Sequence, residues 1–541
     1  MMDEIKYEAA VNQIGYPING QKTAILTEKS SEFHIEEEGT KKIVYRGRTS
    51  QPTFDQSSGS EVRTADFSEL AKPGTYVVVD DEGNRSTPFA LEERPYNELH
   101  KGLLKAFYYL RCGETLDEKY AGEWRHESCH TKRGAVHGEE GLYLDGNGGW
   151  HDAGDYGKYV VAGAKAVADL LLAFEMYPNA FGESIPLPES DQVMPDVLHE
   201  CKVELDFLFK MQDKRSGGVY HKLTTRHFPG LSVMPEEDLA ELVFSPISAA
   251  ATASYAAIMA FASRIYRSYD PSYADRCLRS AEYAWEWLVK HPEAGGFKNP
   301  PDITTGEYGD DCVYDEKYWA AAELYHTTSL EKYHSAFQQY AKESFPKCEL
   351  GWADVGGYGT ISYLRKGKTE ENQALYTSLQ QELISEAERL LHICDNDGYG
   401  ISLEEKDYIW GSNMVLMNRA MLLLIAMKWS PKPEYGKAAA QHLHYLLGQN
   451  TLHLSYVTGF GTHSVMNPHH RPSVGDDVDA PVPGMVAGGP NRNLNDEIME
   501  RTLKGKPAAA SFIDHEDSYA GNEITIYWNS PAVFVVSYFN Q

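Results

Sequence analysis

Two patterns of apolar and polar residues divide the chain. Up to about residue 95, short β-branched and aromatic runs alternate with turn-forming segments, and this alternation predicts strands. From Tyr96 onward, apolar residues recur at spacings of three and four, which is the periodicity of amphipathic helices. We therefore expect a small strand-rich domain at residues 1–95 and a large, mainly α domain at residues 96–541.

The N-terminal segment has the strand and turn spacing of a small antiparallel β-sandwich of the immunoglobulin-like kind. Turn-forming sequences such as PING, AKPG and DEGN separate its apolar runs. Residues 92–95 then form a short linker. The expected strands are Tyr7–Tyr16, Lys22–Thr27, Phe33–Glu37, Lys42–Tyr45, Thr75–Val79 and Ser86–Leu91.

The helical segment contains long periodic stretches joined by loops rich in Gly, Asp and aromatic residues. Residues 448–514 form the longest loop, and long irregular loops inside a compact domain are usually functional. Repeated helical hairpins fit a closed helical barrel. The expected helices are Lys158–Tyr177, Val197–Gln212, Ser245–Tyr266, Tyr273–Val289, Asp315–Tyr325, Glu331–Glu343, Leu375–Ile393, Ser412–Lys428 and Lys437–Leu447.

The amino-acid composition excludes some classes of binding partner. The chain has 541 residues, of which 42% are hydrophobic, and this is enough to bury a substantial core. Its formal net charge of −29 repels phosphate backbones and anionic lipids, so we expect no nucleic-acid and no membrane partner. A neutral substrate or a metal cation is compatible with this charge, and we expect a monomer.

The number of cysteines and the N-terminal sequence indicate the cellular compartment in which the protein is expected. Seven cysteines in so long a chain do not indicate a disulfide framework. The opening sequence, MMDEIKYEAAVNQIGY, has neither a basic n-region nor an apolar h-region. We therefore expect a cytoplasmic protein; a chain whose leader had been removed would look the same and would be secreted.

The first candidate site is the glycine-rich segment GGWHDAGDYGK at residues 148–158. It places the carboxylates of Asp152 and Asp155 three residues apart on one turn. Repulsion between two such carboxylates makes one of them hold its proton more tightly, and the pair could position and activate a water. Calcium ligation, or an N-cap formed by Asp155, explains the same spacing.

The second candidate site is FIDHEDSYAGNEI at residues 512–524, which leads into an apolar C-terminal helix. We expect Glu523 to begin this helix and to pack against apolar residues, which would raise its pKa toward that of a general acid at neutral pH. The alternative role for Glu523 is to stabilise the N-terminus of the helix dipole. Asp514 and Asp517 are placed to orient neighbours or bind sugar hydroxyls.

The third candidate site is the pair of segments SYVTGFG (455–461) and NPHHRPS (467–473). Prolines flank His469 and Arg471, so that both could be presented rigidly to hydroxyl groups. The alternative is a surface loop that happens to hold a His pair.

These segments, together with YDEKYWAAAELY at 314–325 and DSYAGNEITIYWN at 517–529, resemble glycoside hydrolase family 9, the inverting cellulase family. They occur in the order of the family and span most of residues 97–541. VNQIGY (11–16) and PGTYVVV (73–79) are similar to the immunoglobulin-like domain of one branch. The resemblance implies an (α/α)6 barrel with its cleft formed by loops at one end.

The resemblance also implies residue roles. Asp155 corresponds to the general base, Asp152 to the carboxylate that helps to hold the water, and Glu523 to the general acid. Inversion needs room for a water between base and sugar. The positions expected to bind substrate are His469, Arg471, Asp514 and Tyr519.

A zinc site is expected near the first motif. Cys112, Cys129, His130 and His151 would form a Cys₂His₂ set that suits tetrahedral Zn²⁺, although buried free cysteines would explain the thiols equally well. The resemblance favours a structural zinc, because that branch often carries one here. His137 is the alternative to His151 as the fourth ligand.

Calcium is the second metal expected. Asp310, Asp311, Asp315 and Glu316 are clustered, Asp354 follows in GWADVGG, and hard oxygen ligands suit Ca²⁺. A helix N-terminus rich in acids is the alternative. The resemblance implies calcium at this place, and Asp476 and Asp479 are candidates for a second site. No organic cofactor is expected.

We therefore expect an inverting hydrolase of β-1,4-linked glucans or cello-oligosaccharides, of the endoglucanase kind. An exo-acting β-glucosaminidase on chitosan oligosaccharides is the main alternative. A polysaccharide lyase would need a different base and a cationic site, which the acidic balance disfavours. A sugar-binding protein without catalysis would not need Asp152, Asp155 and Glu523 together.

Overall fold

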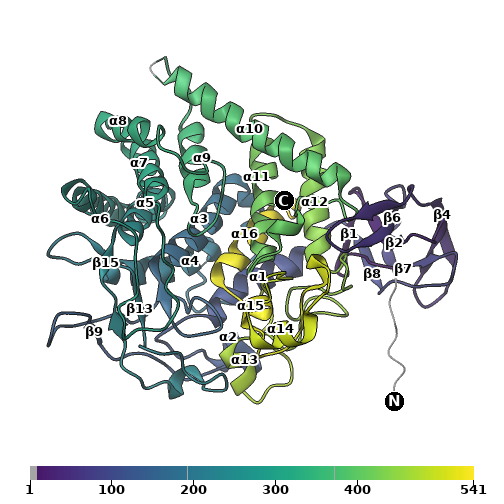
Figure 1. Cartoon of the computed structure of the whole chain (residues 1–541), viewed down its shortest axis with the longest axis horizontal. Helices are drawn as coiled ribbons and strands as arrows, with labels where there is room; N and C mark the ends of the chain where they lie inside the picture. Colours follow the sequence, from purple (N-terminus) through teal and green to yellow (C-terminus); the bar gives the residue numbers. More distant parts are fainter. Residues whose placement is uncertain (1–8, 192, 371) are drawn as a thin grey trace.

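The computed structural model describes residues 9–191, 193–370 and 372–541, and it places a strand-rich unit beside a larger helical body (Figure 1). The N-terminal unit contains two sheets that face each other across a shared apolar core. One sheet has the strand order β1-β8-β7-β3-β4 and the other β2-β6-β5. The strands are β1 Gly15–Pro17, β2 Thr23–Thr27, β3 Glu32–Glu37, β4 Ile43–Arg48, β5 Thr53–Asp55, β6 Ser60–Asp66, β7 Gly74–Asp80 and β8 Phe89–Glu92.

The first expected strand differs most from the structure. Residues 7 and 8 of the expected strand Tyr7–Tyr16 lie outside the described residues. Of the others, only Gly15 and Tyr16 belong to a strand, β1, which pairs in parallel with β8. The cause is the side chain of Asn12, whose Oδ1 accepts the backbone N–H groups of Ile14 at 3.0 Å and Gly15 at 3.3 Å. This local turn competes with extension of the strand. Strands β5 and β6 were not predicted at all.

The helical body begins at α1 and continues to the C-terminus. Its long helices are α1 Asn97–Tyr109, α3 Val160–Met176, α4 Asp196–Met211, α5 Ala249–Tyr266, α6 Pro271–Lys290, α7 Tyr314–Thr328, α8 Glu331–Tyr340, α9 Gly356–Lys366, α10 Gln373–Asn396, α11 Ser412–Ala426, α12 Pro433–Leu446 and α16 Ile526–Phe539. The shorter helices are α2 Glu118–Ala121, α13 Arg471–Gly475, α14 Glu497–Leu503 and α15 Tyr519–Asn522. Each of the nine helices expected within residues 158–447 has a counterpart here.

The helices fall into an inner and an outer set. Helices α3, α5, α7, α9, α11 and α16 are buried over most of their length. For α3, α5, α11 and α16 this is expected, because these helices are apolar on nearly every side. Within this set α16 packs against α3 and α11, α3 against α5, α5 against α7, and α7 against α9. The outer helices are amphipathic: α6, for example, packs one face against α5 and leaves the other in water.

Short strands link the helices at the end of the body that carries the site. A sheet with the order β10-β9-β14-β13-β11 includes β11 Lys158–Tyr159 and β13 Lys222–Thr224, which pair antiparallel. Its other members are β9 Gly134–Val136, β10 Tyr143–Leu144 and β14 Val243–Phe244, while β12 Val219–Tyr220 pairs separately with β15 Ile247–Ser248. These pairings hold the segment before α3 against the segment before α5.

Polar groups join the strand-rich unit to the helical body at α12. Asn12 Nδ2 lies 3.1 Å from the hydroxyl of Tyr96 and 3.0 Å from Nδ1 of His444, and the ring of Tyr16 meets His444 edge to face. The side chain of Thr23 lies within hydrogen-bond distance of Gln441 and Gln449. All seven side chains are buried, so this interface is a fixed part of the molecule.

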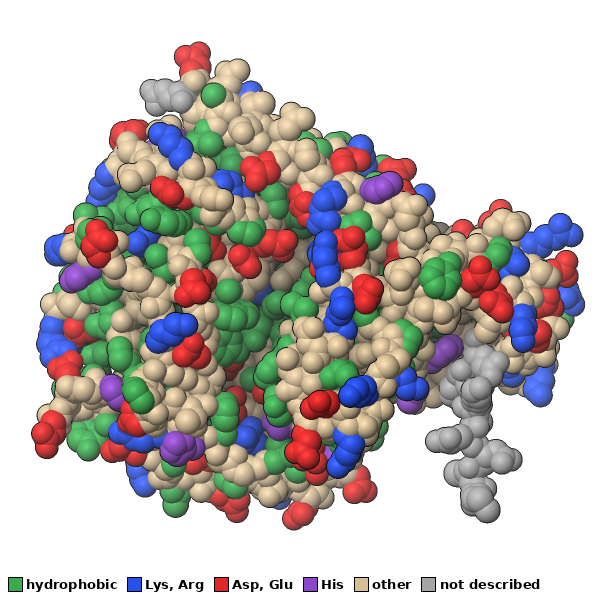
Figure 2. Space-filling view, viewed as in Figure 1, with side chains coloured by type: hydrophobic (Ala, Val, Ile, Leu, Met, Phe, Trp, Pro, Cys, Tyr) green, Lys and Arg blue, Asp and Glu red, His purple; other side chains and the backbone are tan. Residues whose placement is uncertain are grey.

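Figure 2 draws one face of the molecule as a surface. The face drawn in Figure 2 is hollowed at the middle of the helical body, with hydrophobic side chains lining the hollow and acidic side chains spread widely around it. Among the described residues, no helix has the length and apolar character required to cross a bilayer.

Candidate active site

A cleft of about 950 Å³ brings together residues from segments that lie far apart in the sequence. Asp152, Asp155 and Glu523 all line it, as do two of the expected substrate-binding residues, His469 and Arg471. A third, Tyr519, lies in the same wall. The remaining aromatic side chains of the cleft are those of Phe228, Tyr159, Tyr308, Trp352, Trp410, Tyr527 and Trp528.

Backbone hydrogen bonds fix the three expected motifs to one another. Asp152 O accepts the N–H of Ile526 at 2.9 Å, and Gly154 O accepts the N–H of Arg471 at 3.1 Å. His469 N–H donates to Asn522 O at 2.9 Å. A Cβ on Gly154 would lie 2.0 Å from His469 O, so only glycine permits this close approach. The geometry of the turn therefore depends on both later segments.

Asp152 is buried and has an unusual partner. The hydroxyl of Tyr308 donates to its Oδ2 at 2.5 Å and lies 3.0 Å from the hydroxyl of Tyr527, while Oδ1 has no partner in the described part of the chain. Burial raises the pKa of Asp152 well above its usual range, and the charge of Asp155 adds to this, although the bond from Tyr308 lowers it. The hydrogen-bonding capacity of this buried Oδ1 is therefore not met by the described residues.

Asp155 is buried beside two cations. Its Oδ2 accepts the N–H of Gly157 at 2.8 Å, so it does not cap α3, whose N-cap is Tyr159. Burial raises the pKa of Asp155, and the positive charges of Arg471 and Lys222 act in the opposite direction. These two charges favour the ionised carboxylate that a base requires.

Glu523 lies in an extended segment between α15 and α16. The expectation that it begins the C-terminal helix was wrong. Thr525 accepts the N–H of Trp528 as an N-cap, so α16 begins at Ile526 and Glu523 pairs instead with His469 in a short parallel bridge. Burial raises the pKa of Glu523 well above its usual range, with further increases from the charges of Asp155 and Asp152. A carboxyl group of this kind keeps its proton at a higher pH than an exposed one.

The other expected substrate-binding residues have different surroundings. The guanidinium of Arg471 donates to Gly154 O at 2.7 Å and to Pro229 O at 3.0 Å, so much of its donor capacity holds backbone. Nδ1 of His469 lies 2.5 Å from Glu516 O, which leaves Nε2 free to meet a ligand. Tyr519 donates its hydroxyl to Asn495 O at 3.0 Å and leaves its ring in the cleft.

Asp514 is not among the residues that line the cleft. Its two oxygens accept the N–H groups of Met466 and Asn467, each at 2.8 Å, and Asn522 Nδ2 lies 3.0 Å away. The side chain therefore holds the start of the 467–473 segment against the segment that carries Glu523.

Comparison with known proteins bears on the identity of this site. The family model described as "Glycosyl hydrolase family 9" matches residues 96–536, which is most of the chain. The chain belongs to glycosyl hydrolase family 9. It is therefore a glycoside hydrolase, and residues 7–84 match the model described as "Cellulase N-terminal ig-like domain".

Relatives cover nearly the whole length of this family 9 chain. A cellodextrinase of Butyrivibrio fibrisolvens is 41% identical, over 97% of this chain and 98% of its own. Endoglucanase D of Acetivibrio thermocellus is 35% identical, over 98% of this chain and 83% of its own length. Among solved structures, a single mutant of a thermostable endoglucanase from Alicyclobacillus acidocaldarius has a TM-score of 0.94 at 41% identity, covering 99% of this chain and 100% of its own. A zinc-binding triple mutant of the family 9 endoglucanase J30 has a TM-score of 0.90 at 33% identity, and the match covers 97% of this chain and 100% of the mutant's chain.

The family 9 chain brings the four expected zinc ligands together. Cys112, Cys129, His130 and His151 are buried, and one ligand atom from each lies within 4.8 Å of the others. Nδ1 of His130 is buried with no partner among the described residues, while its Nε2 lies 3.4 Å from Asp238. This is the arrangement of a metal-binding histidine oriented by an outer carboxylate. The alternative ligand, His137, lies 3.0 Å from Asp302 instead and is not part of the cluster.

The expected calcium ligands form a looser group. Oδ2 of Asp310, Oδ1 of Asp315 and both carboxyl oxygens of Glu316 are buried and have no partner in the part of the chain described. Burial raises the pKa of Asp310 to about 7, and neighbouring acids add to this increase. The side chains of Asp311 and Asp354 are exposed.

The structure gives less support to a second calcium site at Asp476 and Asp479. Oδ2 of Asp476 is buried without a partner among the described residues, whereas Asp479 is exposed. No group of three candidate ligands that includes either residue lies within 4.8 Å in the described part of the chain.

Several residues of the cleft gave no signal in the sequence. Tyr308 and Trp352 come from two separate loops and meet edge to face with ring centres 4.8 Å apart. Trp410 lies at the end of the loop before α11, and its ring centre is 5.4 Å from that of Tyr519. Lys222, beside Asp155, donates to Gly306 O at 2.6 Å, and burial lowers its pKa to about 8. Only the long aromatic-rich loops hinted at these residues.

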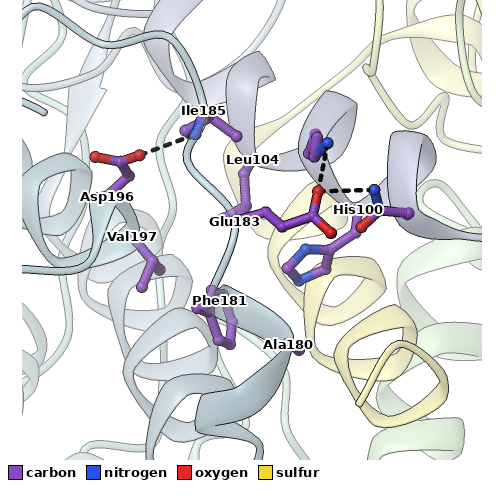
Figure 3. A pocket seen from close by; sticks show the side chains of 10 residues that line it. His100, Leu104, Ala180, Phe181, Glu183, Ile185, Asp196 and Val197 are labelled. Carbon is purple, nitrogen blue, oxygen red and sulfur yellow. Dashed lines mark hydrogen bonds and ion pairs between the residues drawn. The ribbon is translucent and has the colours of Figure 1, made fainter. Parts of the chain in front are cut away.

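A second hollow, between α1 and the segment after α3, is too small for a sugar. It holds about 10 Å³, and its walls include His100, Phe181 and Val197 (Figure 3). In Figure 3 the carboxylate of Glu183 faces two nitrogen atoms, which belong to Asn97 at 3.0 Å and Lys101 at 2.7 Å. This volume accommodates about one water molecule.

Proposed function

We propose that this enzyme hydrolyses β-1,4-glucosidic bonds of cellulose-type glucans and cello-oligosaccharides with inversion at the anomeric carbon. The observation that carries the proposal is the convergence of Asp152, Asp155 and Glu523 on one aromatic-walled cleft. The relatives are named for cellodextrins and glucans, which supports a glucan substrate. No relative named here is a glucosaminidase, and the chitosan alternative therefore has no support.

In this mechanism Glu523 acts as the general acid. Its raised pKa keeps the carboxyl group protonated so that it can donate a proton to the departing glycosidic oxygen. Burial, which disfavours the carboxylate, is the main cause of this increase, and two neighbouring acids reinforce it. The bond then breaks without the formation of a strongly basic leaving group.

Asp155 acts as the general base and Asp152 as the carboxylate that helps to hold the water. Arg471 and Lys222 favour the ionised form of Asp155, which can take a proton from the attacking water. Asp152 keeps one oxygen on Tyr308 and the other free for that water. Attack by water on the face opposite the leaving group inverts the configuration in a single displacement.

The substrate-binding residues divide into two groups in this proposal. His469 contacts the sugar through Nε2, and Tyr519 contacts it through its phenol ring. Arg471 and Asp514 act mainly as positioning residues, because their donors and acceptors hold the backbone of the surrounding loops. The aromatic rings of Trp352 and Trp410 provide flat surfaces for sugar faces.

We propose that the helical body is an (α/α)6 barrel. The inner helices pack in the sequence α11–α16–α3–α5–α7–α9, and the outer helices cover them, which supports this arrangement. The domain boundary that we propose lies between residues 95 and 96, at the start of the helical family match. We also propose that the enzyme acts as a monomer.

We propose structural Zn²⁺ at Cys112, Cys129, His130 and His151. Two thiolates and two imidazoles suit this ion, and the orphaned Nδ1 of His130 fits a ligand role. When bound, zinc would tie the Cys112–Cys129 segment to the turn before Asp152. The zinc-binding mutant in the family supports the presence of a zinc site in this fold.

We propose structural Ca²⁺ at the acidic group of Asp310, Asp311, Asp315, Glu316 and Asp354. Four buried carboxyl oxygens without partners in the described chain suit a hard cation, which would compensate their charge. Bound calcium would fix the loop that carries Tyr308 relative to α7. Asp476 and Asp479 form a second, weaker calcium proposal.

Release of reducing sugar from three substrates tests the proposed activity. Carboxymethylcellulose, cello-oligosaccharides and chitosan oligomers are incubated separately with the full chain. We expect release from the two glucans and little from chitosan. A clear preference for chitosan, or no release from either glucan, would contradict the proposal.

A further inference from the structure

His221 lies between the two segments that meet at Asp152. It directly precedes β13, and its carbonyl oxygen accepts the N–H of Val160, which follows the glycine-rich turn, at 3.1 Å. Its Nε2 lies 3.1 Å from the carbonyl oxygen of Tyr308, the residue whose hydroxyl donates to Asp152. One residue therefore contacts the segments that carry both partners of the Tyr308–Asp152 hydrogen bond.

The partners of the His221 ring determine which nitrogen carries the proton. Because a carbonyl oxygen can only accept a hydrogen bond, Nε2 is protonated and donates to Tyr308 O. Nδ1 then accepts from Oγ of Ser248, which lies 2.8 Å away. Burial, reinforced by the charge of Lys222, lowers the pKa of His221 to about 3, so the ring is neutral near pH 7 and keeps this arrangement.

The ring of His221 is fixed by rigid neighbours. Ser248 is the N-cap of the inner helix α5, and its Oγ also accepts the N–H of Ala251 at 3.0 Å. On its flat side the buried ring stacks on Phe297, with ring centres 3.9 Å apart and planes inclined by 8°. The donor that faces Tyr308 O therefore has a defined position relative to α5.

The backbone of Tyr308 needs such an anchor. Its φ of +47° is an uncommon conformation for a bulky residue and persists only where the surroundings fix it. Within the described part of the chain, the bond from His221 is the one hydrogen bond to backbone groups of Tyr308. Lys222 holds the start of the same loop instead, through Thr305 Oγ1 at 3.0 Å and Gly306 O at 2.6 Å. Loss of the His221 bond would therefore free Tyr308 while the start of the loop stays attached.

We propose that His221 is a positioning residue, whose Nε2–H holds the carbonyl of Tyr308 so that the Tyr308 hydroxyl meets Oδ2 of Asp152. The proposal rests on the role of Asp152 in the proposed hydrolysis of glucans. His221 does not line the cleft, so its effect on the reaction passes through Tyr308. Loss of the Nε2 donor should therefore slow the reaction only while residue 308 has a hydroxyl to position.

Two substitutions that replace different ring nitrogens test the proposal. The side-chain amide of His221→Gln reaches the position of Nε2, whereas that of His221→Asn reaches only the position of Nδ1. We expect His221→Asn to lower kcat/KM on cellopentaose by about three- to ten-fold, the range for one neutral hydrogen bond, and His221→Gln to stay within about two-fold of the wild type. Combined with Tyr308→Phe, His221→Asn should change kcat/KM by less than about two-fold.

His442→Asn is the matched control. His442 is also a buried histidine, and its ring likewise lies at hydrogen-bond distance from a serine hydroxyl and a carbonyl oxygen, those of Ser402 and Ala438. This variant should lower the melting temperature and leave kcat/KM unchanged. Equal losses of kcat/KM from His221→Asn with and without the Tyr308 hydroxyl, or equal losses from His221→Asn and His221→Gln, would overturn the positioning role.

Ser248→Ala tests the same chain of contacts without changing His221. It removes the hydroxyl that orients the ring, and it should lower kcat/KM in the wild type but not in Tyr308→Phe. Equal losses in the two backgrounds would overturn the proposal even if His221→Asn did not fold. That result in an active wild type leaves the proposed function standing, whereas a wild type that hydrolyses no cello-oligosaccharide overturns the function itself.

Discussion

The hydroxyl of Tyr308 donates a hydrogen bond of 2.5 Å to Oδ2 of Asp152, one of the two acids on the glycine-rich turn. Tyr308 has φ +47°, an uncommon conformation for a bulky side chain, and its ring packs against Tyr159 and Trp352. Strain at such a position persists only where the surroundings fix it. This bond lowers the pKa of Asp152, in opposition to burial, which raises it.

Tyr308→Phe should therefore change the pH dependence of the reaction. Without the bond the pKa of Asp152 rises further, and the carboxylate that holds the water forms only at higher pH. The acidic limb of the kcat/KM profile should move to higher pH, while the alkaline limb stays in place. The kcat/KM profiles of the wild type and of Tyr308→Phe on cellopentaose measure this shift. An unchanged acidic limb would show that ionisation of Asp152 does not control that limb.

Asp155→Asn and Glu523→Gln should each lower kcat by about 10²- to 10⁴-fold, because a positioned base or acid contributes this much. Both substitutions keep the size of the side chain and should leave the melting temperature close to that of the wild type. Glu516→Gln removes an exposed acid on the same loop and should retain activity. If either correctly folded variant keeps more than a tenth of the wild-type kcat, its assigned role is wrong.

Zinc should copurify at about one ion per chain when no metal is added. Cys129→Ser should lower both the zinc content and the melting temperature, because binding of a structural metal contributes to the free energy of folding. Cys277→Ser is the matched control, since Cys277 is a buried free cysteine on α6. Elemental analysis and thermal melting check both variants, and equal zinc in all three proteins would place the ion elsewhere.

Asp397, which follows α10 and lies next to Asp55 of the strand-rich unit, should make the stability of the fold depend on pH. Burial and the neighbouring Asp55 raise the pKa of Asp397 well above its usual range, and Gly398 packs against Asp55. The folded state therefore holds a proton that the unfolded state releases above about pH 4. This contribution to stability is full at low pH and is lost as pH rises toward the folded-state pKa.

Asp397→Asn cannot ionise and should melt at a higher temperature than the wild type at pH 8, with a smaller difference at pH 5. Asp395→Asn, which changes an exposed acid in the last turn of α10, two residues before Asp397, is the control. Equal melting-temperature differences at the two pH values would contradict the assignment of the proton to Asp397.

The sequence predicted the inner helices well where they are continuously apolar. Residues 158–177 were expected to form a helix, and α3 spans Val160–Met176. Helix α9 was missed because its first turns are rich in glycine. A Cβ on Gly359 would lie 2.5 Å from the ring of Tyr318, so tight packing requires the residue that masks the helical signal.

The site was predictable where its residues share a short motif. Asp152 and Asp155 occur on one turn, and their convergence with Glu523 followed only from the family resemblance. Tyr308, Trp352 and Trp410 could not be predicted, because each is a lone aromatic residue in its own loop. Folding alone brings these rings to one cleft, through contacts between segments separated by many residues.

The anomeric configuration of the first product tests the central claim most directly. Proton NMR follows the hydrolysis of cellopentaose by the wild-type enzyme before mutarotation equilibrates the anomers. Because the account has water attack opposite the leaving group in one displacement, it predicts that the α-anomer appears first. Initial release of the β-anomer would contradict the assignment of Asp155 as a base acting on water and of Glu523 as its opposing acid.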